Sequence, residues 1–392
     1  MLLGAVVFVL LLGSCSTCGK QERYVVVLSM DGFRSDYPDR AYTPTLDSLA
    51  EAGVRAAFRP AFPSVTFPNH YSMATGLYPD HHGLVSNFFY ALDLDSVYRM
   101  ADPTPGFYGG EPIWNTAEKQ GVHAASFFWV GSEYSIQGCQ PSIWKPFDKN
   151  IPFAARADSV VAWLQFPEDI CPHLIMWYME ELDGIGHACT PDSSATLQKV
   201  EELDRVLNHF FNEARKLDIF NQIDFLVVSD HGMATFTPDK YVNLNDYLPR
   251  DSFDYVFDGV PVLLYPKASY TDSAYAILKQ VPHITVWKKN EIPEKYVYGS
   301  NPRIGDLFVL PDIGTYVKFR AESNPRYAAT HGYDNFAPEM EAIFYAAGPS
   351  FRQNVKLPVM DNVNLYLIIA KLFGLQPAPN DGDSAVVESL LK

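Results

Sequence analysis

The stretch YVVVLSMDG, residues 24–32, is a run of β-branched and other apolar residues that stops at an aspartate and a glycine. A strand that is apolar at every position is buried on both faces, which is typical of a parallel sheet covered by helices. Two later runs have the same form: HLIMWYME at 173–180 leads to Asp183, and IDFLVVS at 223–229 stops at Asp230. The sequence therefore predicts three buried strands, each followed by a carboxylate.

Segments with helical character alternate with these strands. The longest, residues 192–217, repeats apolar side chains every three or four positions, as an amphipathic helix does. Further helices are predicted at 43–53, 112–121, 154–164 and 361–373, and further strands at 123–130 and 341–347. This alternation indicates an α/β fold with a mainly parallel, doubly wound sheet flanked by helices. Residues 239–319 have short segments rich in tyrosine and proline, which predict a small α+β insertion, or cap.

Length and charge restrict the classes of partner. The 392 residues, 47% of them hydrophobic, are enough for one large domain with an insertion or for two domains. A formal net charge of −16 argues against binding to a nucleic-acid polymer. An anionic small molecule would need a local source of positive charge, and bound metal ions are the obvious one.

The first residues resemble a bacterial lipoprotein signal. Residues 2–12 are apolar, too short a run to span a bilayer, and are followed by Gly13, Ser14 and Cys15. We expect a signal peptide over 1–14, a lipid on Cys15, a tether over 15–23 and the ordered domain over 24–392. The protein would then be lipid-anchored in the bacterial cell envelope, periplasmic or surface-exposed, with the membrane reached only through that lipid. An ordinary secretory signal with a chance cysteine is the alternative. The sequence leaves open which of the other cysteines pair: Cys18, Cys139, Cys171 and Cys189.

The strand-end carboxylates are expected to meet. In an open α/β sheet the ligand site lies beyond the carboxyl ends of the strands, which would bring Asp31, Asp183 and Asp230 to one edge. Each aspartate alone is equally typical of a turn or a helix cap. Three carboxylates without counter-charge repel one another and shift one another's pKa. Divalent cations would relieve that repulsion.

Histidines accompany the carboxylates. His187 follows Asp183 by four residues, His231 directly follows Asp230, and His331 opens HGYD just before the strand at 341–347. Mixed aspartate and histidine ligation suits Zn²⁺ or a similar transition metal better than Ca²⁺ or Mg²⁺. The remaining histidines are interpreted as structural or surface residues: His70, His81, His82, His123, His173, His209 and His283.

A threonine between two prolines is the candidate nucleophile. In FPSVTFPNHYSMATGLYPDHHG, residues 62–83, Thr66 lies between Pro63 and Pro68, ahead of a helix predicted to begin near Tyr71. A helix N-terminus favours an anion, and a metal can hold a threonine hydroxyl as the reactive alkoxide. Taken alone, the stretch favours a surface loop that contains a buried threonine.

Six short motifs follow one another along the chain: MDGFR (30–34), TFPNHY (66–71), TGLYPDHHG (75–83), Tyr178 and Glu180 with DGIGH (183–187), SDHGM (229–233) and HGYD (331–334). With these motifs the chain resembles the nucleotide pyrophosphatase/phosphodiesterase family of the alkaline phosphatase superfamily, over everything from Tyr24 onward. One such motif is weakly specific, whereas six in the same order are a strong signal. The resemblance implies an alkaline-phosphatase-like fold.

The resemblance also implies a site with two Zn²⁺ per chain. The implied ligands of one ion are Asp183, His187 and His331, and those of the other are Asp31, Asp230, His231 and the Thr66 oxygen. The residues implied to act on substrate are Thr66 as nucleophile, Asn87 at a phosphoryl oxygen, Phe67 and Tyr178 beside the nucleotide base, and Trp144, which stands where family members often carry a tyrosine.

The implied activity is zinc-dependent hydrolysis of phosphodiester and pyrophosphate bonds in nucleotides, which releases nucleoside 5′-monophosphates through a covalent phospho-threonine. A sulfatase would need Cys/Ser-x-Pro-x-Arg where this chain has Thr66-Phe-Pro-Asn. Two alternatives stay open. One is a phosphodiesterase acting on choline-type (lyso)phospholipids, since aromatic residues such as Phe67 also line choline cages. The other is a non-catalytic surface lipoprotein. The sequence does not specify which nucleotide is the substrate, or the oligomeric state.

Overall fold

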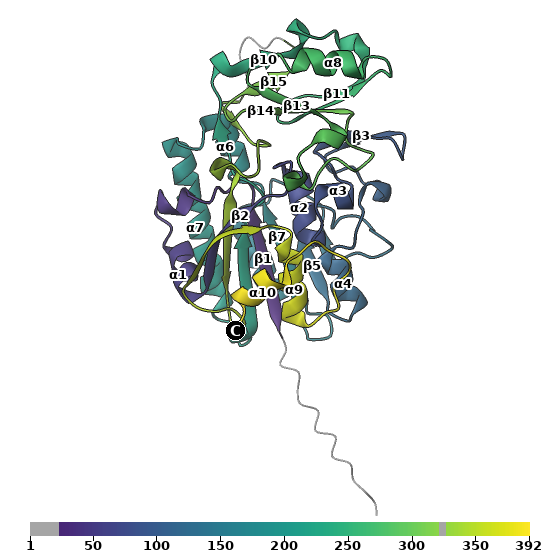
Figure 1. Ribbon diagram of the computed structural model, residues 1–392. Coiled ribbons are helices and arrows are strands. Elements are labelled where there is room, and N and C mark those ends of the chain that lie inside the picture. Colours follow the sequence, from purple (N-terminus) through teal and green to yellow (C-terminus); the bar gives the residue numbers. More distant parts are fainter. Residues whose placement is uncertain (1–22, 321–326) are drawn as a thin grey trace, which may run out of the picture.

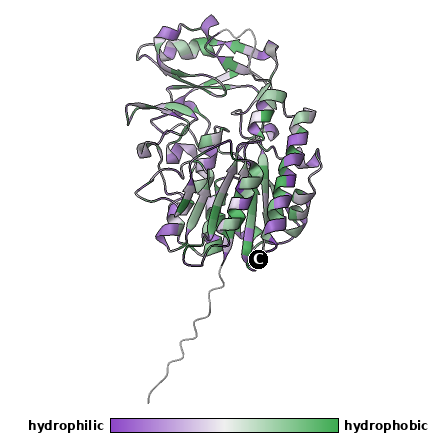
Figure 2. Cartoon of the chain, turned by 180° about the vertical axis from the view of Figure 1, so that it is seen from behind, coloured by the Kyte–Doolittle hydropathy of each residue, from purple (hydrophilic) through white to green (hydrophobic). Residues whose placement is uncertain are grey.

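An eight-stranded sheet forms the centre of the computed structural model, which describes residues 23–320 and 327–392 (Figure 1). From one edge to the other its strands are β18 (Val355–Asp361), β2 (Val54–Arg59), β17 (Ala342–Ala347), β8 (Ile223–Val228), β1 (Tyr24–Met30), β7 (Leu174–Met179), β5 (Ala124–Phe127) and β6 (Ile143–Lys145). The three buried strands predicted from apolar runs are thus neighbours at the middle of the sheet. Figure 2 shows their largely hydrophobic character.

Strand direction confirms the prediction of a mainly parallel sheet, with one exception. β1 pairs in parallel with β7 and β8, β5 pairs in parallel with β6 and β7, and β18 pairs in parallel with β2. β17 runs antiparallel to both of its neighbours, β2 and β8. The chain that precedes β17 therefore lies at the same edge as the chain that follows the parallel strands.

Helices cover both faces of the sheet, because alternate residues of each strand face opposite ways. Val25 and Val27 of β1 lie in one buried cluster, with α2 (Thr66–Thr75), α4 (Ile113–Lys119) and α9 (Asn364–Phe373). Val26 and Leu28 lie in the other cluster, with α1 (Pro44–Ala52), α5 (Phe153–Trp163) and α7 (Ser194–Ala214). Full burial of each such side chain is worth roughly 1.5–3 kcal/mol.

Several element boundaries differ from the sequence predictions by a few residues, and two of these differences lie near the candidate site. α2 begins at Thr66 and not near Tyr71, because Pro68 falls in the first turn, where its missing N–H would have no partner in the helix. β5 ends at Phe127, earlier than the predicted residue 130, because Phe128 has φ +75°, which takes the chain out of the strand. The first difference makes Thr66 the first residue of a helix.

The segment predicted as an insertion, residues 239–319, contains a second, smaller sheet, and we call this segment the small lobe. Its four strands are ordered β11 (Phe253–Phe257), β12 (Val262–Pro266), β14 (Leu307–Pro311) and β13 (Ile284–Lys288). The helix α8 (Thr271–Leu278) packs on this sheet, and β10 (Tyr241–Asn243) pairs with β15 (Tyr316–Lys318). Figure 1 shows the lobe beyond the carboxyl ends of the central strands.

Two buried charged residues join the small lobe to the chain that follows α2. Asp80, in the short helix α3 (Pro79–His82), accepts hydrogen bonds from the backbone N–H groups of Gly299, Ser300 and Asn301 at 2.9, 3.0 and 3.0 Å. Arg303 of the lobe donates to the carbonyl oxygens of Gly83, Gly106 and Phe107 at 3.1, 2.8 and 2.9 Å. Because both side chains are only 8% exposed, these bonds are shielded from water.

The predicted signal peptide over 1–14, Cys15 and Cys18 lie outside the described residues. Within residues 23–320 and 327–392, we find no helical segment with the length and apolar character needed to cross a bilayer. No disulfide joins any two of the cysteines in those ranges, which are Cys139, Cys171 and Cys189.

Candidate metal and nucleophile site

Three carboxylates converge at the carboxyl edge of the central sheet. Asp31 directly follows β1, Asp230 lies two residues beyond β8, and Asp183 begins the helix α6 (Asp183–Cys189) after β7. Asp31 and Asp230 are 2% and 0% exposed. The structure therefore brings together the aspartates that the sequence placed at strand ends.

Each of these carboxylates has one buried oxygen without a hydrogen-bond partner: Asp31 Oδ1, Asp183 Oδ1 and Asp230 Oδ2. An unsatisfied buried acceptor costs about 1–3 kcal/mol, and more when it is charged. Three such oxygens side by side are what a cation would satisfy.

The three carboxyl groups do not share one electrostatic environment. Burial, together with the charges of Asp230 and Asp183, raises the pKa of Asp31 well above its usual range. Burial also acts to raise the pKa of Asp183, but the neighbouring imidazoles of His187 and His331 leave it lowered. Asp31 is therefore the carboxyl group that takes up a proton first when no cation is bound.

The three predicted histidine ligands are held in the same way. Each has Nδ1 against a backbone carbonyl: Ala329 for His187 (2.7 Å), Gly232 for His231 (2.9 Å) and Ser64 for His331 (3.0 Å). A carbonyl only accepts, so Nδ1 carries the hydrogen and Nε2 keeps its lone pair. Nε2 lies 3.2 Å from Asp183 in His187, 3.4 Å from Asp183 in His331 and 3.1 Å from Asp230 in His231. This arrangement is the one by which proteins orient histidines toward a metal.

The ligand atoms fall into overlapping groups whose members lie within 4.8 Å of one another. Asp183, His187 and His331 form one group, which is the set predicted for one ion. The residues predicted for the other ion are divided between two groups, namely Asp31 with Asp183 and His231, and Asp31 with His70 and Asp230. Burial, followed by the charge of His231, lowers the pKa of His331 to about 3, so its imidazole is neutral, as a ligand must be.

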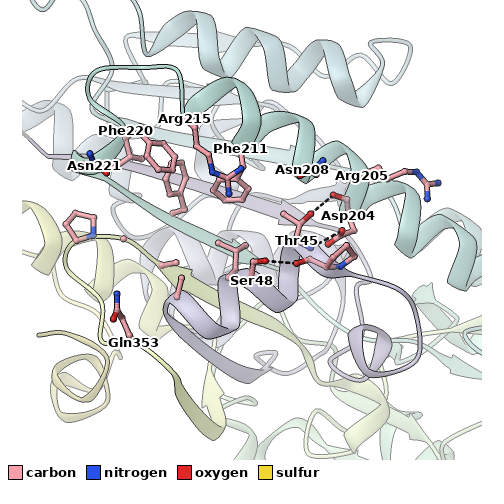
Figure 3. Close-up of a pocket in the computed structure, with 18 of the residues that line it drawn as sticks. Thr45, Ser48, Asp204, Arg205, Asn208, Phe211, Arg215, Phe220, Asn221 and Gln353 are labelled. Atoms are coloured by element: carbon pink, nitrogen blue, oxygen red, sulfur yellow. Dashed lines mark hydrogen bonds between the residues drawn. The ribbon is translucent and has the colours of Figure 1, made fainter.

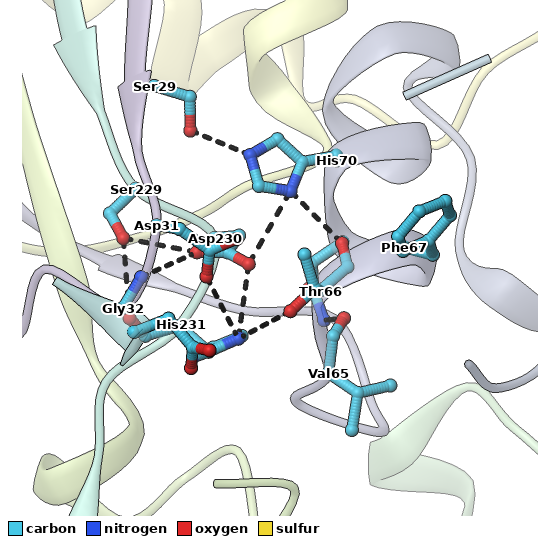
Figure 4. Close-up of polar contacts among 12 residues, drawn as sticks. Ser29, Asp31, Gly32, Val65, Thr66, Phe67, His70, Ser229, Asp230 and His231 are labelled. Atoms are coloured by element: carbon cyan, nitrogen blue, oxygen red, sulfur yellow. Dashed lines mark hydrogen bonds and ion pairs between the residues drawn. The ribbon is translucent and has the colours of Figure 1, made fainter. Parts of the chain in front are cut away.

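Thr66 points into this cluster from the first turn of α2. Its Oγ1 lies 3.1 Å from Nε2 of His231 (Figure 4). Because Nε2 carries no hydrogen, the threonine hydroxyl is the donor of this bond. Nε2 of His231 thus lies close to both the Thr66 hydroxyl and the carboxylate of Asp230.

Asn87 and Phe67 lie beside Thr66. Oδ1 of Asn87 accepts a hydrogen bond from the backbone N–H of Phe67 at 2.9 Å. With its oxygen engaged, Asn87 has its NH₂ group left to donate to a phosphoryl oxygen, as the predicted role requires. Phe67, the second residue of α2, already donates its N–H to Asn87, and Pro68, the third, has no N–H. The start of α2 therefore has fewer free N–H groups for an anion than a helix start usually has.

Tyr178, predicted to flank a nucleotide base, has a further contact that the sequence did not reveal. It is 9% exposed, and its hydroxyl donates to Oδ2 of Asp31 at 2.6 Å. One side chain therefore joins the predicted base site to a predicted metal ligand.

Trp144 is the one predicted site residue that the structure does not bring to the others. It lies within the edge strand β6, 40% exposed, and no hydrogen bond or ring contact within the described ranges joins it to them. Phe147, two residues beyond the end of β6 and 49% exposed, lies with its ring centroid 6.3 Å from that of Tyr178. Phe147 was not predicted from the sequence as a site residue. Its position just beyond the carboxyl end of a strand is the feature that could have indicated it.

We expect Phe147→Ala to raise KM for a nucleotide substrate about tenfold with little change in kcat, because a base–aromatic stack is worth ~1–3 kcal/mol. Trp144→Ala is the matched control and should leave KM unchanged. Steady-state kinetics of the two variants side by side provide the measurement. A larger rise in KM for Trp144→Ala than for Phe147→Ala would show that Trp144, and not Phe147, stacks on the base.

His70 also belongs to the cluster, although its sequence context was read as structural. Its Nδ1 lies 3.1 Å from the carbonyl oxygen of Thr66 and 3.4 Å from Oδ2 of Asp230, and its Nε2 lies 2.9 Å from Oγ of Ser29. The spacing held a clue, since residues four apart in a helix share one side.

A cavity of about 660 Å³ lies elsewhere, between α1, the C-terminal half of α7 and the chain that follows β17 (Figure 3). Ile223, the first residue of β8, and Ala347, the last of the antiparallel β17, both line it. These positions mark the opposite edge of the sheet, away from the site where the carboxylates converge.

Comparison with known proteins gives concordant matches. Residues 25–334 match the family model described as type I phosphodiesterase/nucleotide pyrophosphatase. The chain is 32% identical over 391 residues to a venom phosphodiesterase of Crotalus durissus collilineatus, covering 95% of this chain and 47% of that protein. It is 31% identical over 388 residues to ectonucleotide pyrophosphatase/phosphodiesterase family member 3 of Bos taurus, covering 94% and 44%. The chain thus spans about half the length of the curated relatives it matches.

Among solved structures, murine ectonucleotide pyrophosphatase/phosphodiesterase 5, an inactive variant in complex with AMP, superimposes with a TM-score of 0.90 at 29% identity. The match covers 95% of this chain and 100% of that one. The human form of the same protein superimposes equally well, with a TM-score of 0.90 at 28% identity over 94% of this chain.

Proposed function

This chain belongs to the type I phosphodiesterase/nucleotide pyrophosphatase family, and we propose that it hydrolyses phosphodiester or pyrophosphate bonds of nucleotides and releases nucleoside 5′-monophosphates. The observation that carries the proposal is the Thr66 hydroxyl, which lies 3.1 Å from Nε2 of His231, beside three carboxylates of which two are buried. The AMP bound by a structural relative supports a nucleotide as the substrate class.

The donor set fits two Zn²⁺ ions. Three buried carboxylate oxygens lack partners, and three imidazoles present Nε2 lone pairs beside them. The residues that would hold the ions are Asp183, His187 and His331 for one, and Asp31, Asp230, His231 and Thr66 for the other. When bound, such ions would supply Lewis acidity at the attacking, leaving and phosphoryl oxygens.

The residues of the chain then have distinct tasks. Oγ1 of Thr66 forms a bond to phosphorus, the bond to the leaving oxygen breaks with its electron pair, and the threonine proton passes to solvent. Water next cleaves the phospho-threonine diester, which restores the hydroxyl and releases the nucleoside monophosphate. The NH₂ group of Asn87 stabilises the charge that develops on a phosphoryl oxygen.

The aromatic side chains define the base site. Phe67 directly follows Thr66 in α2, the hydroxyl of Tyr178 donates to Asp31, and Phe147 lies next to Tyr178. Flat aromatic faces stack on any nucleobase with little preference for its hydrogen-bonding pattern. We therefore propose broad base tolerance, with selectivity coming from the leaving group.

A substrate panel tests the proposal. The zinc-loaded protein should hydrolyse the p-nitrophenyl ester of TMP and also ATP, and should act weakly on p-nitrophenyl phosphorylcholine. Activity on the choline ester alone would overturn the nucleotide proposal in favour of a phospholipid substrate. No turnover, together with less than one zinc per chain by metal analysis, would support the non-catalytic binding protein.

A further inference from the structure

His70 occupies a fully enclosed position one helical turn after Thr66. Its side chain is 0% exposed, and its two ring nitrogens face two different elements, a strand and a helix. Nε2 faces Oγ of Ser29 on β1 at 2.9 Å, and Nδ1 faces the carbonyl oxygen of Thr66 at 3.1 Å (Figure 4). The ring therefore connects the strand that carries Asp31 to the helix that carries the nucleophile.

The partners fix the tautomer of His70. Nδ1 meets only acceptors, namely the Thr66 carbonyl and, 3.4 Å away, Oδ2 of Asp230. The hydrogen must then be on Nδ1, and Nε2 accepts from the Ser29 hydroxyl, which can donate. Burial lowers the pKa of His70, against the opposing charge of Asp230, so the ring is neutral at physiological pH.

The ring cannot turn away from these partners. Trp129 and Tyr178 pack edge-on against it, with ring centroids 5.3 and 5.0 Å from that of His70. Nε1 of Trp129 also donates to the backbone carbonyl of His70 at 3.0 Å, which fixes the helix on the same side. A rigid imidazole thus holds the peptide group of Thr66 at a constant distance from β1.

This arrangement differs from that of the three candidate metal ligands. In those residues Nδ1 bonds to a backbone carbonyl and Nε2 faces the carboxylates, whereas Nε2 of His70 faces a serine hydroxyl. The one nitrogen of His70 near Asp230 already carries a hydrogen. His70 is therefore built to hold its neighbours and not to bind an ion.

We propose that His70 is a positioning residue that holds the first turn of α2, and with it the hydroxyl of Thr66, in line for attack on phosphorus. The inference rests on the function proposed for Thr66. It predicts that loss of the Nδ1 donor affects kcat, because the hydroxyl is misplaced, and leaves KM and zinc affinity nearly unchanged, because no contact to base or ion is lost.

Two substitutions separate the donor from the bulk of the ring. His70→Leu removes both nitrogens at similar volume, and we expect a fall in kcat of about 10- to 100-fold. His70→Asn keeps an NH₂ group near the position of Nδ1 and should recover most of that loss. KM, and zinc affinity measured by competition with a chelator, should stay within roughly threefold of the wild type in both variants, because neither ring nitrogen of His70 offers a free lone pair to an ion.

Ser29→Ala is the milder variant, which leaves the imidazole in place and keeps the test valid if the His70 variants fail to fold. It removes the one partner that Nε2 has among the described residues and so lets the ring take the other tautomer, with an expected loss in kcat of about 3- to 10-fold. Nitrogen-15 NMR of histidine in the zinc-free wild-type protein reads the tautomer directly and should show hydrogen on Nδ1 of His70.

The outcomes are distinct. A wild-type protein that hydrolyses no member of the substrate panel overturns the proposed function and this role with it. An active wild type whose His70→Leu variant folds and keeps its kcat overturns the role alone. So does hydrogen on Nε2 of His70, or a loss of zinc affinity as large as the loss of kcat, which would make His70 a ligand or a support for one.

Discussion

Replacing Thr66 by alanine is expected to lower kcat by at least about 10⁴-fold while the protein still binds zinc, because the substitution removes the atom that forms the bond to phosphorus. The six candidate aspartate and histidine ligands remain, and α2 should still begin at position 66, since alanine is a good helix former. The loss should therefore be in turnover and not in folding or metal content.

Thr66→Ser provides the matched control, because it keeps a hydroxyl at the same position and should retain activity. Acid quenching of the reaction followed by intact-mass measurement should show a nucleotidyl adduct on the wild type and none on Thr66→Ala. Zinc content is measured on the same samples. Turnover by Thr66→Ala, or an adduct on another residue, would show that Thr66 is not the nucleophile.

Asp31→Asn should weaken zinc binding by about 100-fold or more and at the same time stabilise the zinc-free protein. The reason for the gain is that buried Asp31 faces two other carboxylates, which raise its pKa, so its ionised form is unfavourable in the folded state. We therefore expect the substitution to raise the free energy of unfolding of the zinc-free protein near neutral pH. Asparagine can still accept the hydrogen bond from Tyr178.

The pH dependence provides the check. A carboxyl group whose folded pKa is raised stabilises the folded state below its unfolded pKa of about 3.9 and loses that contribution as pH rises through the folded value. The stability gain of Asp31→Asn should therefore be largest near pH 7 and vanish toward pH 4. Thermal melts of both proteins in EDTA across this range give the comparison. A variant less stable than the wild type at pH 7 would contradict the proposed repulsion.

Most of the site could be predicted because one rule governs it. Asp31, Asp183 and Asp230 each follow a strand that is buried on both faces, and parallel strands deliver such residues to one edge. His331 reached the same edge by a route that the sequence did not specify. It precedes β17, and only because β17 is antiparallel does the chain before it lie beside the ends of β1 and β8.

The contacts that were not predicted depend on where a strand ends and on which side chains meet in the folded chain. No local sequence pattern specifies either. In IWKPF, residues 143–147, two aromatic side chains lie three positions apart, and only the end of β6 at Lys145 decides which one passes the sheet edge. His70 looked like an ordinary core histidine because nothing local shows that Ser29, more than 40 positions earlier, faces its second nitrogen. Such pairings arise from tertiary packing, which periodicity does not encode.

Asp80 and Arg303 connect the small lobe tightly to the part of the molecule built on the central sheet. A chimera that exchanged residues 239–319 for the corresponding segment of a relative would keep Asp80 but could lose its three amide partners, and would place a foreign side chain where Arg303 now meets three carbonyl oxygens. Stranding one buried charge costs about 3–5 kcal/mol, a large share of the stability of most domains. Recombination between family members should therefore exchange the loop after α2 and the lobe together.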